Sequence, residues 1–489
     1  MAIKFYVNPQ DINQIETPFF YLIDNRWDDF NNKTSYKLYY KPEKQGFVSL
    51  IGDLKIMHET EADTIKIIPN IFDELPEDFG SIGQYIGYYE KLRELFPKNY
   101  MEIIQNLNDI AFLDGSKDKF ERSSGFKHSL IRFSEAEKAF YEIKNMFVGN
   151  PILEDFQFNY KCKIENAEDI HSVDFNFGDN PNLPNRIVSL IGKNGTGKTQ
   201  FLANLALDLS GKSKSKLKEN IFFPKRPLFS KVIAVSYSVF DKFPRPKSDK
   251  SFSYKYCGLK DESGRLLSGP KIVENYEASA KSIIQQSRGQ HWYDVLCKII
   301  GEELTDYYYE EIFIKDNYEI VNNNTHKLLS SGQSFLMYVI TEVIANIKKN
   351  SLILFDEPEM HLHPNAIGNL IRMLEKILTQ FKSYAVIATH SPIILQEIPS
   401  RYVNVFERQG NIPMIYKLGT ESFGENIDVL TENVFKTIEV EDHYKNVLKN
   451  LSKEKPYKNV LSYFDNKLSL NAKTFLLNQY SDPEKELNA

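Results

Sequence analysis

One stretch of this sequence carries residue types suited to binding phosphate. Residues 192–199, "GKNGTGKT", fill every fixed position of the pattern G-x-x-x-x-G-K-S/T. Glycines at 192, 195 and 197 permit close backbone approach, which turns successive N–H groups toward phosphate oxygens. Lys198 adds charge for the β and γ phosphates, and Thr199 offers its hydroxyl to Mg²⁺. We therefore expect ATP and Mg²⁺ to bind this loop, through Gly192, Lys193, Asn194, Gly195, Thr196, Gly197, Lys198, Thr199 and Gln200.

A second stretch, "NSLILFDEPEMHLHP", places two adjacent acids after an apolar run. Asp356 and Glu357 follow Leu352–Phe355 directly, and ligand chemistry in open α/β sheets collects at the carboxyl ends of strands. We expect Asp356 to hold Mg²⁺ and Glu357 to polarise an attacking water. The alternative is a polar strand end without chemistry.

Histidines give two further candidates. His390 ends the apolar run "SYAVIATH", where an imidazole is suited to hydrogen-bonding a γ phosphate. Together with Lys198 and Glu357, it completes the set that we expect to act in catalysis. His361 and His363 have a spacing that fits metal ligands, but no cysteine or third histidine lies nearby in sequence, so we favour a loop role for them.

A third stretch, "LSSGQ" at 329–333, opens an apolar helical pattern. Ser330 and Gln333 fit a capping box that satisfies the N–H groups at a helix start. The same helix start is suited to an anion. Local sequence leaves both interpretations open for Ser330, Ser331, Gly332 and Gln333.

These stretches need particular elements to position them. A buried strand is expected at 187–191 before the phosphate-binding loop, and others at 352–355 and 383–390. After the loop, the spacing of apolar residues predicts a helix whose inner side is formed by Phe201, Leu202, Leu205 and Leu209. A second helix begins at Ser330, with Leu336, Val339, Ile340, Val343 and Ile347 on one face.

The four stretches, in this order, resemble the ABC class of ATPases: Walker A at 192–199, signature at 329–333, Walker B at 352–357 and switch histidine at 390. The resemblance implies an α/β fold, with an ABC-type head made of a P-loop parallel sheet, an antiparallel β-subdomain and a helical signature subdomain. It also implies that Ser330 and Gly332 cap the γ phosphate of ATP held by a partner subunit. The partnership would be a homodimer or a higher even-numbered oligomer.

The sequence departs from the class pattern at two places. Ser331 replaces the first glycine of the commoner L-S-G-G-Q, although a small residue is kept. The glutamine that the class has early in its sequence is not evident here. Ser238 and Asp241 are the candidates to replace it.

Within the class, "DEPEMHLHP" is similar to the branch that contains repair, chromosome-maintenance and phage-defence ATPases. The 131 positions from Thr199 to Ser330 contain no heptads, unlike SMC or Rad-type arms, and no D-x-D of a Toprim nuclease follows His390. The resemblance is greatest to stand-alone defence ATPases, such as the Septu or retron-associated subunit. It implies a regulatory ATPase that controls a separate nuclease or toxin. Two alternatives remain: an ATPase that clamps DNA directly, and a nucleotide-locked scaffold with negligible turnover.

The flanking sequence divides the chain into three expected parts: an accessory α+β module at 1–150, the ATPase domain at 151–420 and a helical tail at 421–489. In the first part, apolar alternation predicts strands around 19–23, 35–40 and 52–58, and helical patterns run from about 81 to 111 and from 134 to 146.

Composition limits the classes of partner. A formal charge of −6 argues against coating nucleic acid through overall charge. Local contact with nucleic acid stays possible through the lysine-rich loops at 211–220 and 241–260, where aromatic residues are interleaved in the second. The absence of a long apolar run and of a secretory h-region predicts a cytoplasmic protein without membrane contact. The three widely spaced cysteines predict free thiols.

Overall fold

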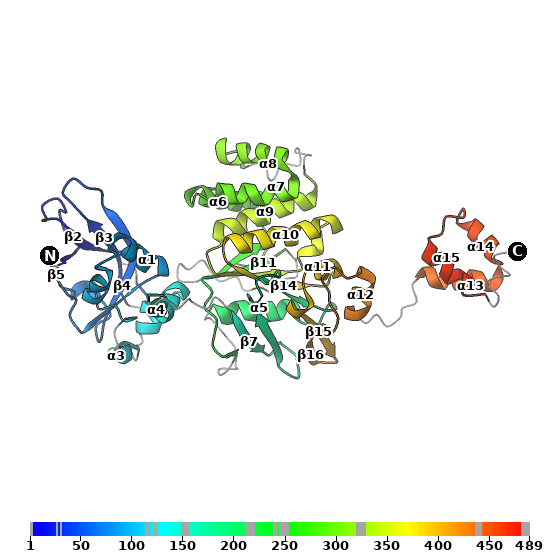
Figure 1. Cartoon of the computed structure of the whole chain (residues 1–489), viewed down its shortest axis with the longest axis horizontal. Coiled ribbons are helices and arrows are strands. Elements are labelled where there is room, and N and C mark those ends of the chain that lie inside the picture. Colours follow the sequence, from blue (N-terminus) through cyan, green and yellow to red (C-terminus); the bar gives the residue numbers. More distant parts are fainter. Residues whose placement is uncertain are drawn as a thin grey trace. The chain divides into compact units, whose positions relative to one another are not determined.

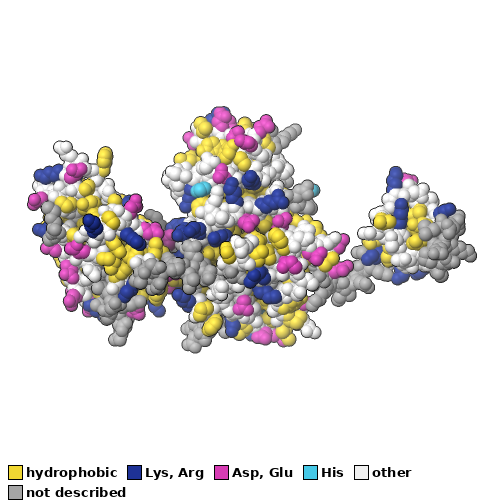
Figure 2. Space-filling model, viewed as in Figure 1, with side chains coloured by type: hydrophobic (Ala, Val, Ile, Leu, Met, Phe, Trp, Pro, Cys, Tyr) yellow, Lys and Arg dark blue, Asp and Glu magenta, His cyan; other side chains and the backbone are white. Residues whose placement is uncertain are grey.

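The chain forms two compact units, Met1–Glu425 and Asn426–Ala489. The computed structural model (Figure 1) describes residues 3–25, 28–29, 32–112, 117–121, 123, 125–147, 156–178, 180–210, 221–237, 243, 254–261, 263–318, 329–435 and 443–480. Figure 2 shows basic and acidic side chains interspersed on the visible face of the first unit. None of the described helices is both long enough and apolar enough to cross a bilayer.

The first unit contains a seven-stranded sheet with the order β12-β11-β13-β14-β9-β15-β16. Neighbouring strands are parallel except for the antiparallel edge pair β15 and β16. Every residue of β9, β13 and β14 is buried, as expected for parallel strands covered on both faces. The bounds are β9 Ile187–Ile191, β11 Lys231–Ser236, β12 Tyr254–Gly258, β13 Ser351–Asp356, β14 Tyr384–Thr389, β15 Val403–Gln409 and β16 Ile412–Lys417.

The strand order brings three sequence motifs to one edge of this sheet. Strand β14 lies between β13 and β9, with Asp356 paired to Ala388 and Thr389 paired to Ile191. The phosphate-binding loop follows β9, the two acids end β13, and His390 follows β14. Because parallel strands share the direction of their carboxyl ends, these motifs lie close together although they are up to about 200 positions apart in sequence.

Two further layers cover the sheet. Helix α5 (Lys198–Leu209) buries the four apolar residues predicted for its inner side, and it lies between the central sheet and an antiparallel sheet of order β10-β7-β8 (Figure 1). Helices α9 and α10 lie on the other side of the central sheet, with α6, α7 and α8 beyond them. The bounds are β7 Gln157–Cys162, β8 His171–Asn176, β10 Phe222–Phe223, α6 Gly269–Gln285, α7 Gly289–Ile300, α8 Glu302–Tyr309, α9 Ser331–Asn346 and α10 Pro364–Gln380. The predicted α/β class, with its parallel sheet, antiparallel β-subdomain and helical subdomain, is confirmed.

The N-terminal part of the first unit is a six-stranded sheet, β5-β1-β2-β3-β4-β6, with helices packed on it. The predicted strands around 19–23, 35–40 and 52–58 are confirmed as β2, β3 and β4. The bounds are β1 Phe5–Val7, β2 Phe19–Asp24, β3 Ser35–Lys41, β4 Ser49–His58, β5 Ile71–Phe72, β6 Phe79–Gly83, α1 Ile86–Leu95, α2 Tyr100–Asn106, α3 Lys117–Glu121 and α4 Ser134–Phe147.

The predicted start of a helix near 81 is wrong. Residues 79–83 form β6, which pairs with β4 and is buried throughout. A side chain at Gly83 would lie 2.2 Å from the Tyr88 ring, and one at Gly80 would lie 2.7 Å from Ile110. The strand therefore fits under its aromatic cover only because these positions lack side chains.

The second unit is helical, in agreement with the predicted short helical tail. Leu448, Tyr457, Val460, Ala472 and Leu476 form a buried cluster of its own. The bounds are α12 Ile427–Phe435, α13 His443–Glu454, α14 Tyr457–Tyr463 and α15 Leu470–Leu477. The three cysteines of the chain, Cys162, Cys257 and Cys297, are free thiols as predicted.

Candidate active site

The phosphate-binding loop wraps around the amino end of α5. Gly195 and Gly197 have φ angles of +81° and +93°, which favour glycine. A side chain at Gly192 would lie 2.0 Å from the carbonyl oxygen of Phe406. Lys198 Nζ donates to the carbonyl oxygens of Gly192 (2.8 Å) and Lys193 (3.0 Å), so the loop closes around its own lysine.

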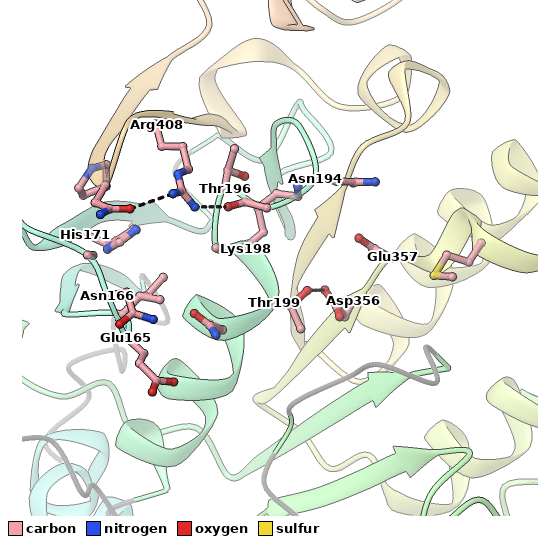
Figure 3. Close-up of a pocket in the computed structure, with 18 residues that line it drawn as sticks. Glu165, Asn166, His171, Asn194, Thr196, Lys198, Thr199, Asp356, Glu357 and Arg408 are labelled. Atoms are coloured by element: carbon pink, nitrogen blue, oxygen red, sulfur yellow. Dashed lines mark hydrogen bonds between the residues drawn. The ribbon is translucent and has the colours of Figure 1, made fainter.

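A cavity of about 620 Å³ opens beside this loop (Figure 3). Seven of the predicted loop residues line it: Asn194, Gly195, Thr196, Gly197, Lys198, Thr199 and Gln200. Asp356 and Glu357 line it from the end of β13, and Figure 3 shows them on the side opposite Arg408 and His171. Backbone N–H groups at a helix start, with a lysine, suit the cavity to a polyphosphate.

Thr199 and Asp356 meet at the floor of the cavity. Thr199 Oγ1 donates to Asp356 Oδ1 at 2.9 Å, and Asp356 is almost fully buried. The oxygens of these two side chains are suitable ligands for Mg²⁺, which proteins usually bind through one or two of their own groups together with phosphates and water. The described residues contain no group of three or more His, Cys, Asp or Glu placed to hold a metal by themselves.

Glu357 is held in a backbone conformation that is rare for glutamate. Its φ of +45° lies in the left-handed region, which costs free energy outside glycine and is common at functional sites. Its N–H donates to the carbonyl oxygen of Ala388 at 2.8 Å. The neighbouring strand β14 thereby fixes the turn that directs this carboxylate into the cavity.

Burial lowers the pKa of Lys198, and three nearby carboxylates oppose that shift: Glu357, Asp356 and Glu359. A triphosphate placed in the cavity would add negative charge beside the same ammonium group. Bound phosphate is therefore expected to favour the charged form of Lys198.

The structure adds Glu359, which the sequence reasoning missed. Its Oε1 accepts hydrogen bonds from Thr389 Oγ1 (2.6 Å) and from the backbone N–H of His390 (2.8 Å). The same oxygen lies 3.2 Å from His390 Nδ1, and Glu357 Oε1 lies 3.9 Å from that nitrogen. Glu359 is buried, so it links the turn after β13 to the turn after β14 and holds His390 through its backbone, whereas His390 Nδ1 makes no hydrogen bond in the described structure.

Replacing Glu359 with Gln is expected to lower kcat for ATP hydrolysis by about tenfold, because small displacements of an aligned group are costly in rate. KM for ATP should change less than twofold, since Glu359 does not line the cavity. Steady-state kinetics with a parallel melting curve checks this. A wild-type kcat in a normally folded variant would contradict a role for Glu359 in orienting His390.

Arg408 and His171 also line the cavity without a local sequence signal. Arg408 Nη1 donates to the Gly195 carbonyl oxygen and Nη2 to Asn411 Oδ1, each at 3.0 Å. Burial lowers the pKa of His171 to about 4, so its imidazole is neutral near pH 7. The pairing of β15 with β9 brings Arg408 to the loop. His171, at the start of β8, lies beside Phe201 of α5, with 6.5 Å between the ring centroids.

The signature residues lie elsewhere. Ser330 Oγ accepts from the Gln333 N–H at 3.3 Å, and the Ser330 N–H donates to Gln333 Oε1 at 2.9 Å, which is the predicted capping box. Gly332 lies in the first turn of α9, whereas the side chain of Ser331 is outside the described structure. None of the residues 329–333 lines the cavity of its own chain, and neither does His390.

Some sequence predictions cannot be placed. Ser238 and Asp241, the candidates for the work of the missing glutamine, lie outside the described residues. So do the loop at 211–220 and most of the loop at 241–260.

Comparisons with known proteins relate the chain to ATPases. Residues 310–396 match the family described as "AAA domain, putative AbiEii toxin, Type IV TA system". Protein ea59 of Escherichia phage lambda is 29% identical over 447 residues, which cover 84% of each chain. The Septu protein PtuA of Bacillus thuringiensis is 24% identical over 299 residues, or 48% of this chain and 72% of PtuA.

Solved structures with some likeness include ABC proteins. An inward-facing, putative metal-chelate type ABC transporter is 16% identical, with a TM-score of 0.30, and the match covers 54% of this chain and 84% of that one. The ATP-binding cassette of an ABC transporter in its ADP conformation is 15% identical, with a TM-score of 0.26, and the match covers 58% of this chain and 96% of that one.

The layered fold, the phosphate-binding loop and the acidic end of β13 define an ABC-like ATPase. The family match and the similarity to PtuA relate it more particularly to the ATPases of phage defence.

Proposed function

We propose that this chain is an ATP-hydrolysing switch that closes as a dimer on ATP and regulates a separate nuclease or toxin. One observation carries the proposal. Lys198, Thr199, Asp356 and Glu357 line one cavity, while Ser330, at the exposed start of α9, lies outside it. A chain that holds ATP in its own cavity would leave its signature serine available to the nucleotide of a partner.

In this proposal, Lys198 and the N–H groups of the loop bind the phosphates. Thr199 and Asp356 would hold Mg²⁺, which when bound neutralises phosphate charge. Glu357 accepts a proton from the attacking water, and His390, oriented by Glu359, donates a hydrogen bond to the γ phosphate. Charge stabilisation by positioned groups then supplies most of the catalysis.

The N-terminal module offers a route for regulation. Both carboxylate oxygens of Glu135, on α4, lie about 3 Å from Lys348 Nζ. Lys348 belongs to the turn that joins the signature helix α9 to β13, the strand that ends in Asp356. The motifs lie at the opposite ends of these elements, roughly 24 Å away along α9 and roughly 17 Å away along β13. A partner bound to the module would thus act on both motifs through the elements that carry them. Control of an effector rests on the similarity to PtuA and to the toxin-related family.

The first test is steady-state ATP hydrolysis by the purified chain, with and without duplex DNA. A rate that duplex DNA leaves unchanged, and that responds to the product of a neighbouring nuclease or toxin gene, is the expected result. Strong stimulation by duplex DNA alone would favour the DNA clamp instead. ATP-bound oligomers with almost no turnover would favour the scaffold.

A further inference from the structure

A second cavity, of about 520 Å³, lies where the N-terminal part of the first unit meets the ATPase domain. One wall comes from β3, β4, the turn between β6 and α1, and the start of α4. The other wall comes from the start of β11 and the turn between α9 and β13. This cavity shares no lining residue with the one beside the phosphate-binding loop. Its volume lies within the range of small-molecule sites, about 300 to 1,000 Å³, so it has room for a ligand of its own.

Five charged residues line this second cavity, and four of them have a partner of opposite charge. Lys231 is the fifth, and among the described residues it has no carboxylate within ion-pair distance. Its Nζ donates to Asn346 Oδ1 at 3.1 Å. Because an ammonium group has three donors, two are left to bind a ligand. The pairs of the other four are Glu135 with Lys348, Lys55 with Asp29, and Asp53 with Lys37.

Lys231 is partly buried, which makes the missing counter-ion costly. Burial lowers the pKa of Lys231 to about 8, and the charges of Lys348 and Lys255 act in the same direction, whereas Cys257 and Glu135 oppose the shift. The side chain is therefore still mostly charged near pH 7. A charge held away from water without a partner costs free energy, and an anion bound in the cavity would remove that cost.

Gln84 gives the same cavity an acceptor without a donor. The residue is 8% exposed, and its Nε2 donates to the carbonyl oxygens of Ile82 and Leu130, each at 3.2 Å. These two bonds fix the amide, so that Oε1 and Nε2 cannot exchange places. In the part of the chain that the structure describes, Oε1 is buried and accepts no hydrogen bond. A hydroxyl or amino group of a ligand would satisfy it.

We propose that this cavity binds a phosphorylated sugar or nucleoside, with the phosphate at Lys231 and a hydroxyl or amino group at Gln84. Lysine binds phosphate as a point charge, whereas a carboxylate is matched best by the fork of an arginine. No arginine is among the described residues that line the cavity. Tyr85 adds an aromatic ring to the lining, against which a base would pack. The inference goes beyond the proposed switch and does not depend on ATP hydrolysis.

Isothermal titration calorimetry on the full chain with Lys198→Ala tests the inference, because this background weakens binding in the phosphate-binding loop. AMP and ribose 5-phosphate are the probes. Adding Lys231→Met, which keeps the length of the side chain and removes its charge, should weaken binding of the probes by about tenfold or more. AMP that binds more tightly than ribose 5-phosphate identifies a nucleotide site, and equal binding identifies a sugar phosphate site. Melting curves check that each variant is folded.

The matched control adds Lys298→Met instead. Lys298 is an exposed residue of α7, so this change removes one lysine outside the cavity, and binding should be unchanged. Equal affinity with and without Lys231→Met would overturn the inference, and so would a folded parent that binds neither probe. Inorganic phosphate that binds as tightly as both probes would also overturn it, because Gln84 would then contact no ligand group. A wild-type chain that hydrolyses no ATP would count against the proposed function alone.

Discussion

Replacing Glu357 with Gln is expected to lower the rate of ATP hydrolysis by about 10²- to 10⁴-fold, the usual contribution of a positioned acid or base. Affinity for ATP should hardly change, because Gln has the same shape and Lys198, Thr199 and Asp356 remain in place. Gln also has the same steric demands at the φ of +45° that Glu357 adopts. Bound ATP should then persist, and light scattering should detect a stable dimer.

The control for this variant is Glu375→Gln. Glu375 is an exposed residue of α10, so its replacement removes the same charge at a distance from the cavity. Normal turnover is expected. If Glu357→Gln also hydrolysed ATP at the wild-type rate, another group would have to activate the water. If Glu357→Gln hydrolysed ATP slowly but formed no dimer, the loss of hydrolysis would not by itself stabilise the closed dimer.

Replacing Ser330 with Arg is expected to abolish hydrolysis by blocking closure, while ATP still binds to each separate chain. The reason is the position of Ser330, outside its own cavity and exposed at the start of α9. Loss of the cap costs about 1 kcal/mol, so Ser330→Ala serves as the control that removes the cap without adding bulk. Filter binding and turnover distinguish the two effects.

Mixing two inactive variants decides whether the serine acts on the partner. Lys198→Ala damages only the phosphate side, and Ser330→Arg damages only the signature side. A mixed dimer contains one site with both defects and one site with neither, so mixing should restore activity. A mixed dimer that is verified to close on ATP and still hydrolyses none would rule out action in trans.

Local sequence determined much of this protein. Gly192, Lys198 and Thr199 have the spacing of a phosphate-binding loop, which predicts a strand, a tight loop and a helix in this order. The structure contains these as β9, the loop and α5. The capping pair Ser330 and Gln333 was likewise predictable, because the two residues contact each other within one helical turn. Such contacts depend on neighbours in sequence and leave a readable pattern.

Tertiary structure decided the remainder. Glu359 meets Thr389 and His390 only because β14 pairs with β13, and Arg408 reaches the loop only because β15 pairs with β9. Residues 79–83 became a strand for a similar reason, since β4 pairs with them and bulky rings cover their glycines. Pairing between strands far apart in sequence has no local signature, because its free energy comes from burial and hydrogen bonds that exist only in the assembled sheet.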